Sequence, residues 1–145
     1  MIVIADSNIF FSALFTPKGI TAQILTSKSS IQFLVPEYLY EEVEEHLQMV
    51  ADYTRRPKTK IKQDLKRLML KITVVPTDEV PLIHRQKAAQ IVADIDRDDA
   101  PFVALHFYKK HKIWTGDRVL INGLKAKGYD IFITTDELKN KLYKK

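Results

Sequence analysis

The feature that most constrains the fold of this chain is the alternation of short apolar runs with segments of helical periodicity. The runs are rich in β-branched residues, which is typical of strands buried on both faces of a parallel sheet. They cover residues 2–5, 31–35, 72–75, 112–114 and 130–133. Because strands that alternate with helices pair in parallel through right-handed crossovers, we expect an α/β fold whose parallel sheet is covered by helices on both faces.

Between these runs, apolar residues recur every three or four positions, which predicts amphipathic helices. The longest covers residues 37–54, and shorter ones are expected over residues 10–15, 20–27, 60–70, 81–93, 102–110, 118–126 and 135–142. We expect Ile20 to face inward and Thr135 to cap the last helix. No linker divides the chain, so residues 1–145 are expected to form a single domain with a frayed end at Lys144 and Lys145.

The chain has 145 residues, 46% of them apolar, which is enough for a hydrophobic core without disulfide bonds. It contains no cysteine, which excludes a disulfide framework, a thiol nucleophile and a cysteine zinc site. The lack of cysteine also fits a reducing compartment, so we expect a cytoplasmic protein. The longest apolar runs are far shorter than a membrane span, and we expect no association with a membrane.

The net charge of +5 favours a polyanionic partner, and the charges are distributed unevenly. Residues 37–52 contain six acids and no Lys or Arg, whereas residues 53–71 contain eight Lys or Arg and a single acid. Candidates for contacts with nucleic-acid phosphates are Arg55, Arg56, Lys58, Lys60 and Lys62. The alternative interpretation is a solvated helix face, which is the commoner role of such a charge run.

Carboxylates gather where the predicted strands end. Asp6 follows the first strand directly, and Asp117 follows the fourth after two intervening residues. The helix after the second strand carries the adjacent Glu41 and Glu42, and the acidic segment 94–99 opens the helix that leads to the fourth strand. Because ligand sites of open parallel sheets lie beyond the carboxyl ends of the strands, we expect carboxylates from these four segments to converge.

Carboxylates that converge in this way repel one another. Two like charges about 4 Å apart repel by roughly 4 kcal/mol at an effective dielectric constant of about 20. A hard divalent cation removes the repulsion, and Mg²⁺ is bound in proteins by a few carboxylates together with water. Taken singly, each acid has a simpler interpretation, since Asp6 and Asp96 can cap helices and Glu41 and Glu42 can belong to a solvated face. The convergence of four segments favours a metal site.

Three segments of the chain resemble the PIN domain family. Residues 6–14, DSNIFFSAL, look like the opening of PIN domains, in which a strand-end Asp is followed by a small hydroxyl residue and Asn. Residues 96–105, DRDDAPFVAL, look like the acidic segment that leads into the buried helix of the family. Residues 113–117, IWTGD, look like the end of its fourth strand. The segments occur in the order and spacing of the family along essentially the whole chain.

The resemblance implies a three-layer α/β/α sandwich with strand order 3-2-1-4-5 and an Mg²⁺- or Mn²⁺-dependent ribonuclease site. Carried over residue by residue, the four catalytic and metal-binding acids are Asp6, Glu42, Asp99 and Asp117. Glu41, the neighbour of Glu42, stays open as an alternative second acid, and Asp96 is a candidate extra ligand or supporting group. Asn8 and Thr115 match supporting positions that orient the acids or the metal-bound water.

The chain departs from the family pattern directly after Asp117. Many members carry a further acid within a residue or two, whereas Arg118, Val119 and Leu120 follow here. We therefore expect one well-held metal ion rather than two. The chemistry that the resemblance implies is hydrolysis of an RNA phosphodiester, in which the metal lowers the pKa of a bound water and steadies the phosphoryl transfer.

The resemblance leaves the biological role and the partners open. Many small PIN proteins resemble VapC-type toxins, which a partner antitoxin holds inactive, and others process RNA without an antitoxin. Tyr38, Tyr40 and Tyr53 flank the basic segment and are candidates either for stacking on RNA bases or for a homodimer interface. The main alternative function is a non-catalytic PIN-fold module for RNA binding or assembly, against which the presence of all four acids argues.

Overall fold

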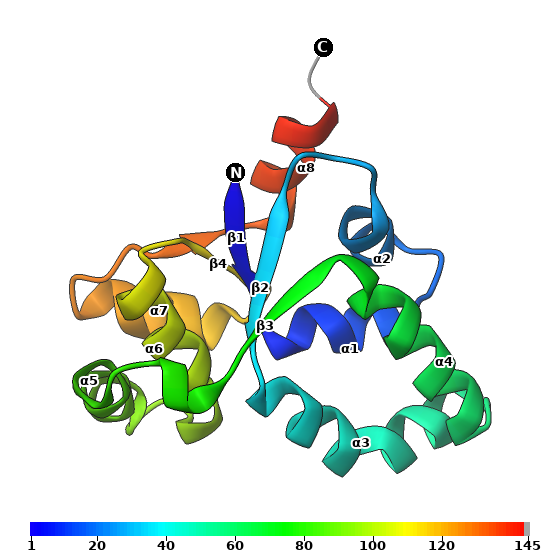
Figure 1. Ribbon diagram of the computed structural model, residues 1–145, viewed down its shortest axis with the longest axis horizontal. Coiled ribbons are helices and arrows are strands. Elements are labelled where there is room, and N and C mark those ends of the chain that lie inside the picture. Colours follow the sequence, from blue (N-terminus) through cyan, green and yellow to red (C-terminus); the bar gives the residue numbers. More distant parts are fainter. Residues whose placement is uncertain (144–145) are drawn as a thin grey trace.

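The computed structural model describes residues 1–143 as an α/β structure on a five-stranded, all-parallel sheet. The strand order is β3-β2-β1-β4-β5, which confirms the expected order 3-2-1-4-5 (Figure 1). The strands are β1 (Ile2–Ala5), β2 (Gln32–Pro36), β3 (Ile72–Val75), β4 (Ile113–Trp114) and β5 (Phe132–Ile133). Lys144 and Lys145, expected to form a frayed end, lie outside the described residues.

The central strand β1 places its carboxyl end between those of its two neighbours, β2 and β4. β4 and β5 are shorter than expected, although the Lys112 carbonyl still accepts from the Ile4 N–H at 2.9 Å and the Ile131 carbonyl from the Ile113 N–H at 2.9 Å. The ladder still reaches the edge at which Asp6 lies, since the Asp6 N–H donates to the Trp114 carbonyl at 3.0 Å. The register therefore sets Asp6 beside the residues that follow β4.

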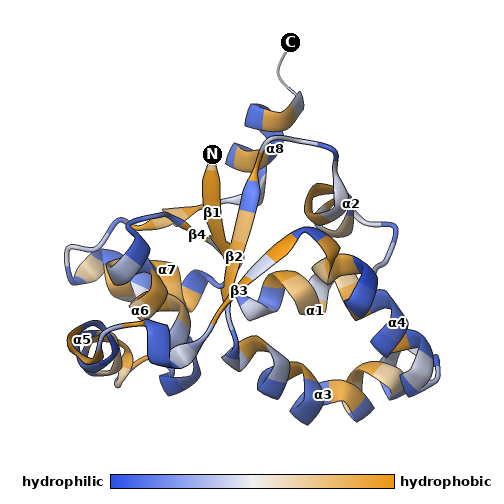
Figure 2. Ribbon diagram, viewed as in Figure 1, coloured by the Kyte–Doolittle hydropathy of each residue, from blue (hydrophilic) through white to orange (hydrophobic). Residues whose placement is uncertain are grey.

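Helices cover both faces of the sheet (Figure 1). They are α1 (Ser7–Phe15), α2 (Ile20–Thr26), α3 (Tyr38–Thr54), α4 (Lys58–Leu68), α5 (Leu82–Val92), α6 (Ala100–Lys109), α7 (Arg118–Ala126) and α8 (Thr135–Tyr143), with the 3-10 helices η1 (Met69–Lys71), η2 (Thr77–Glu79) and η3 (Arg97–Asp99). One core cluster joins the sheet mainly to α1, α2, α3, α4 and α8, and a second joins it to α5, α6 and α7. Figure 2 shows the hydrophobic strands between these layers and the mixed character of α3 and α4. The expected three-layer sandwich is thus confirmed.

Most expected helices appear within a few residues of their predicted bounds, with two corrections of detail. Ile20 does not face inward, because it is the first residue of α2 and its side chain is 36% exposed. Thr135 does not cap α8, because the Thr134 hydroxyl accepts from the Glu137 N–H at 3.1 Å while the Glu137 carboxylate accepts from the Thr134 N–H at 3.2 Å. This reciprocal pair is a capping box. The Thr135 hydroxyl instead accepts from the Trp114 indole N–H at 3.0 Å.

Over residues 1–143, none of the helices combines the length and the apolar character that crossing a membrane requires.

Candidate active site

Asp6 lies at the carboxyl end of β1, where one carboxylate serves two neighbours. Its Oδ1 accepts from the Ser7 N–H at 2.8 Å and so caps α1. Its Oδ2 accepts from the Thr115 hydroxyl at 2.7 Å. The side chain is only 2% exposed. The simple interpretation as a helix cap and the interpretation as part of a carboxylate cluster therefore both describe this residue.

Thr115 connects the ends of β1 and β4. Its hydroxyl donates to Asp6 and accepts from the Asn8 side-chain amide at 3.1 Å and from the Asp117 N–H at 3.1 Å. Of the two predicted supporting residues, Thr115 thus bonds Asp6 directly, and Asn8 bonds Thr115. The hydroxyl holds the Asp6 carboxylate in one orientation, because all three of its hydrogen-bonding positions are occupied.

Glu42 reaches the same edge from α3. Its Oε2 accepts from the Ser7 hydroxyl at 3.4 Å, while Oε1 is buried and has no hydrogen-bond partner in the described part of the chain. The neighbouring Glu41 is exposed. The difference follows from the helix, because Leu39 and Val43 are buried and Glu42 lies at the border of that inward face. The geometry favours Glu42 over Glu41 as the acid of this site.

Asp99 and Asp96 lie in the segment before α6 and have different environments. Asp99 is 7% exposed, its side chain does not cap α6, and its Oδ2 is buried without a partner among residues 1–143. Asp96 is exposed, and its Oδ1 accepts from the Asp98 N–H at 3.0 Å to cap η3. Asp96 therefore caps a helix, as its residue type suggests. Asp99, by contrast, has one carboxylate oxygen that accepts no hydrogen bond from the described residues.

Asp117 completes the edge at the start of α7. Its Oδ1 accepts from the Leu120 N–H at 3.1 Å, so it caps that helix. Its charge nevertheless contributes to raising the pKa of both Asp6 and Asp99. Asp117 is thus close enough to belong electrostatically to the same cluster.

The carboxylates of this cluster are harder to ionise than ordinary ones. Burial, and repulsion from Asp117 and Asp96, raise the pKa of Asp6 to about 6. Burial and repulsion from Asp6 raise the pKa of Glu42 to about 8 and that of Asp99 to about 8. The acids that contribute to these pKa shifts come from four segments of the chain. Buried carboxylate oxygens without a donor are costly unless a cation compensates them.

Whether these residues fit a metal ion depends on how many protein side chains must bind the ion directly. Among residues 1–143, no group of three or more His, Asp or Glu side chains is arranged so that it could hold an ion directly. The donor chemistry does fit, because Mg²⁺ takes one or two carboxylates and keeps most of its waters. Glu42 and Asp99 each have an oxygen free for that purpose. The direct ligands among the four acids stay a prediction.

Comparison with known proteins gives the family. The family model of the PIN domain matches residues 4–142. The chain belongs to the PIN domain family. No curated protein matches it significantly. PIN domains are in general nucleases that use divalent metals.

A solved structure with the same fold is the crystal structure of VapBC2 from Rickettsia felis bound to a DNA fragment from their promoter. The match has a TM-score of 0.67 and 11% identity, and it covers 92% of this chain and 97% of the matched chain. At that identity the likeness is one of fold. It extends over nearly the whole of this PIN domain.

Two residues of this PIN domain contact the acids in ways that the sequence did not reveal. The Ser7 hydroxyl contacts Glu42, and the Tyr38 hydroxyl donates to Asp98 at 2.9 Å. Tyr38 was considered only for base stacking or dimer contacts. Its spacing is the signal that could have found it, because Tyr38 precedes Glu42 by one helical turn and so shares its face.

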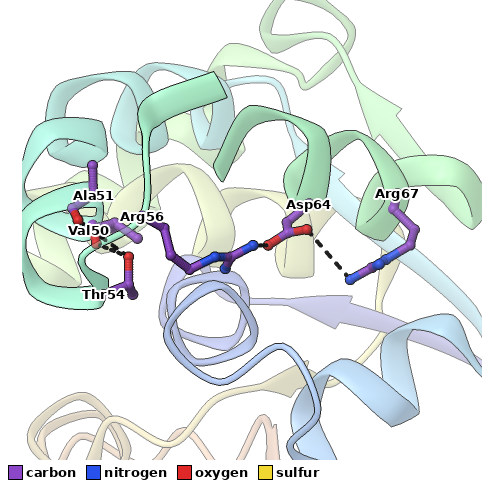
Figure 3. Close-up of polar contacts among 6 residues, drawn as sticks. All are labelled: Val50, Ala51, Thr54, Arg56, Asp64 and Arg67. Carbon is purple, nitrogen blue, oxygen red and sulfur yellow. Dashed lines mark hydrogen bonds and ion pairs between the residues drawn. The ribbon is translucent and has the colours of Figure 1, made fainter. Parts of the chain in front are cut away.

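The basic residues of the PIN domain fall into two groups. Arg56 bonds Asp64 of α4, and Arg67 approaches the other Asp64 oxygen at 3.7 Å (Figure 3). Arg56 therefore links the end of α3 to α4 and is not a free phosphate ligand. The other candidate side chains are exposed, and they are Arg55, Lys58, Lys60 and Lys62.

Proposed function

We propose that this PIN domain is a metal-dependent ribonuclease that hydrolyses phosphodiester bonds in RNA. The observation that carries the proposal is the group of buried and half-buried carboxylates at the carboxyl ends of the strands, in which Glu42 and Asp99 each keep one oxygen without a partner. A purely structural cluster would satisfy these oxygens or replace the acids, because unpartnered buried carboxylates destabilise a fold. A divalent cation bound there would compensate the unpartnered carboxylate oxygens.

The proposed roles follow from the position of each acid. Asp6, Glu42 and Asp99 would hold Mg²⁺ or Mn²⁺ directly or through water, and Asp96 is a candidate outer ligand. When bound, the ion would supply a water of lowered pKa and neutralise charge on the phosphoryl group. Thr115 and Asn8 fix the Asp6 carboxylate through the bonds described above. Asp117, held in place by its helix-capping bond, would orient the attacking water.

Contacts with the RNA backbone are proposed for the exposed basic residues around α4. These side chains are Arg55, Lys58, Lys60 and Lys62. Phosphate contacts of this kind give affinity without sequence preference and weaken as salt rises. Arg56 contributes less to RNA binding, because Asp64 already neutralises it.

An antitoxin partner is proposed on the fold alone. The similar solved structure is that of a VapBC2 complex, which supports a partner protein for this chain as well. We also propose that the chain forms a homodimer, for which the exposed Tyr53 at the end of α3 is a candidate contact. The alternative of a non-catalytic RNA-binding or assembly module predicts that the four acids are dispensable.

The decisive experiment is cleavage of labelled single-stranded RNA with Mn²⁺, with Mg²⁺ or with EDTA. We expect the wild type to cut only with metal, and Asp6→Asn to be slower by about 100-fold or more, as for the loss of a group that positions a metal. Asp130→Asn, an exposed acid outside the cluster, is the matched control and should cut normally. Equal cutting by Asp6→Asn, or cutting in EDTA, would refute the proposal. RNA that is bound but never cut would support the non-catalytic alternative.

A further inference from the structure

A hydrogen bond links α3 to η3 at the rim of the carboxylate cluster. The Tyr38 hydroxyl, on the first residue of α3, donates to Asp98 Oδ1 of η3 at 2.9 Å. The two residues are 60 positions apart in the chain. α3 packs in one core cluster, while α6, which follows η3, packs mainly in the other. The bond therefore connects segments that do not share a layer.

The bond also joins the two segments that carry the unpartnered oxygens. Tyr38 lies one helical turn before Glu42 on α3, and Asp98 directly precedes Asp99. Asp6 and Asp117 belong to the sheet edge, where the bonds of Thr115 hold them together. Glu42 and Asp99, by contrast, approach this edge from opposite layers.

We propose that Tyr38 is a positioning residue that fixes the separation of Glu42 and Asp99. The inference rests on the proposed metal site. Repulsion among Glu42, Asp98 and Asp99 acts to separate the start of α3 from η3 once these acids are ionised. Glu37, which precedes α3, accepts from the Thr77 N–H at 2.6 Å and donates its own N–H to the Val75 carbonyl at 3.1 Å, and these bonds tie the start of the helix to η2 and β3. The Tyr38 hydroxyl ties it to η3.

A neutral donor suits this place better than a cation. The four ion pairs among residues 1–143 engage Asp64, Glu79 and Asp94, and none engages an acid of the cluster. A Lys or Arg at the rim would compete with a divalent ion for the same carboxylates. The phenol donates one hydrogen bond, holds the two segments and leaves the cluster its negative charge.

The test compares Tyr38→Phe with Tyr40→Phe in the full chain. Tyr40 is an exposed residue in the same helical turn whose hydroxyl makes no hydrogen bond within the described residues, so it is a matched control. Mn²⁺ affinity is measured by electron paramagnetic resonance without RNA, at a temperature at which circular dichroism shows all variants folded. We expect Tyr38→Phe to raise the Kd for Mn²⁺ about 3- to 10-fold, and Tyr40→Phe to leave it unchanged.

Two further readouts separate positioning from a general structural effect. RNA cleavage by Tyr38→Phe should fall at limiting Mn²⁺ and recover at saturating Mn²⁺. The assay is run at a temperature at which all variants are folded without metal, so stabilisation by the bound ion does not account for the recovery. A double-mutant cycle with Asp98→Ala should show coupling, so that the second change adds little to the first. Equal Kd values for Tyr38→Phe and wild type, or additive effects in the cycle, would overturn the inference while the proposed function stands.

Failure of the proposed function gives a different result. A wild type that binds no Mn²⁺ refutes the metal site itself. The positioning role is then decided by amide hydrogen exchange in the metal-free protein at residues 96–100. Faster exchange there in Tyr38→Phe, but not in Tyr40→Phe, supports the link between α3 and η3, and equal exchange in all three proteins overturns it.

Discussion

Replacing Asp6 with Asn should stabilise the metal-free protein although it removes a proposed catalytic group. Asp6 is 2% exposed, and its pKa is raised from 3.8 to about 6, first by burial. Asn keeps an oxygen that can accept from the Ser7 N–H, so the cap on α1 is retained. Its amide nitrogen cannot accept from the Thr115 hydroxyl as Asp6 Oδ2 does, so that hydrogen bond is lost at every pH, at a cost of about 1 kcal/mol. The substitution also removes the larger cost of ionising a buried acid beside Asp117.

The magnitude and the pH range follow from the two pKa values. The difference between 3.8 and about 6 corresponds to about 3 kcal/mol when Asp6 is ionised in both folded and unfolded protein. Below pH 3.8 the acid is protonated in both states, so the wild type loses nothing. As pH rises from about 4 to about 6 this cost develops, and above that range it is constant. In a chain of this length about 3 kcal/mol corresponds to about 6 to 12 °C in Tm.

The assay is thermal unfolding in EDTA, followed by circular dichroism at pH 4, 6 and 8. Relative to the wild type, Asp6→Asn should become more stable by about 3 kcal/mol between pH 4 and pH 8, and Asp130→Asn should follow the wild type throughout. Saturating Mn²⁺ should narrow the gap by stabilising only the wild type, by about 2.7 kcal/mol at 100 times its Kd. The reasoning about the buried charge would be refuted if the Tm of Asp6→Asn did not exceed that of the wild type at pH 8, or if the difference between the two Tm values did not change with pH.

The remaining predictions concern ligand choice, metal number and the basic helix. Glu42→Gln should slow RNA cleavage about 100-fold while Glu41→Gln stays within about 3-fold, and equal losses would show that the assignment between them is wrong. Calorimetric titration should give one tightly bound Mn²⁺ per chain. Two sites of equal affinity would contradict the inference that Arg118, in place of a further acid after Asp117, leaves room for one metal ion. Lys62→Ala should weaken RNA binding and flatten its salt dependence, measured by fluorescence anisotropy. Arg56→Ala should instead cost about 1 to 3 kcal/mol in urea unfolding, since it leaves Asp64 with only the more distant Arg67 as a partner.

The edge of the sheet shows how much of the candidate site could be predicted from the strand pattern alone. The order of apolar runs and the rule for ligand sites in parallel sheets were enough to place Asp6 and Asp117 at one edge. The resemblance to PIN domains added the strand order, which the structure confirms. Local chemistry was also readable, since Asp6 and Asp96 do cap helices as their residue types suggest.

Residue-level contacts across the site were not predictable, because they depend on packing between distant segments. The sequence left Glu41 and Glu42 as rivals, and only the seating of α3 on the core turns Glu42 toward Ser7 and leaves Glu41 in solvent. The basic run looked uniform, yet the α3–α4 packing gives Arg56 an internal partner.

The layers, the order of the elements and the positions of acids after the strands could be predicted from periodicity and residue type, because both act locally. Which oxygens are buried, which are left without partners and which hydroxyls reach them depends on how distant segments pack. Tyr38 illustrates the difference. Its position on α3 can be predicted from the sequence. Its bond to Asp98 forms only because α3 and η3, which belong to different layers, meet beside the carboxylate cluster.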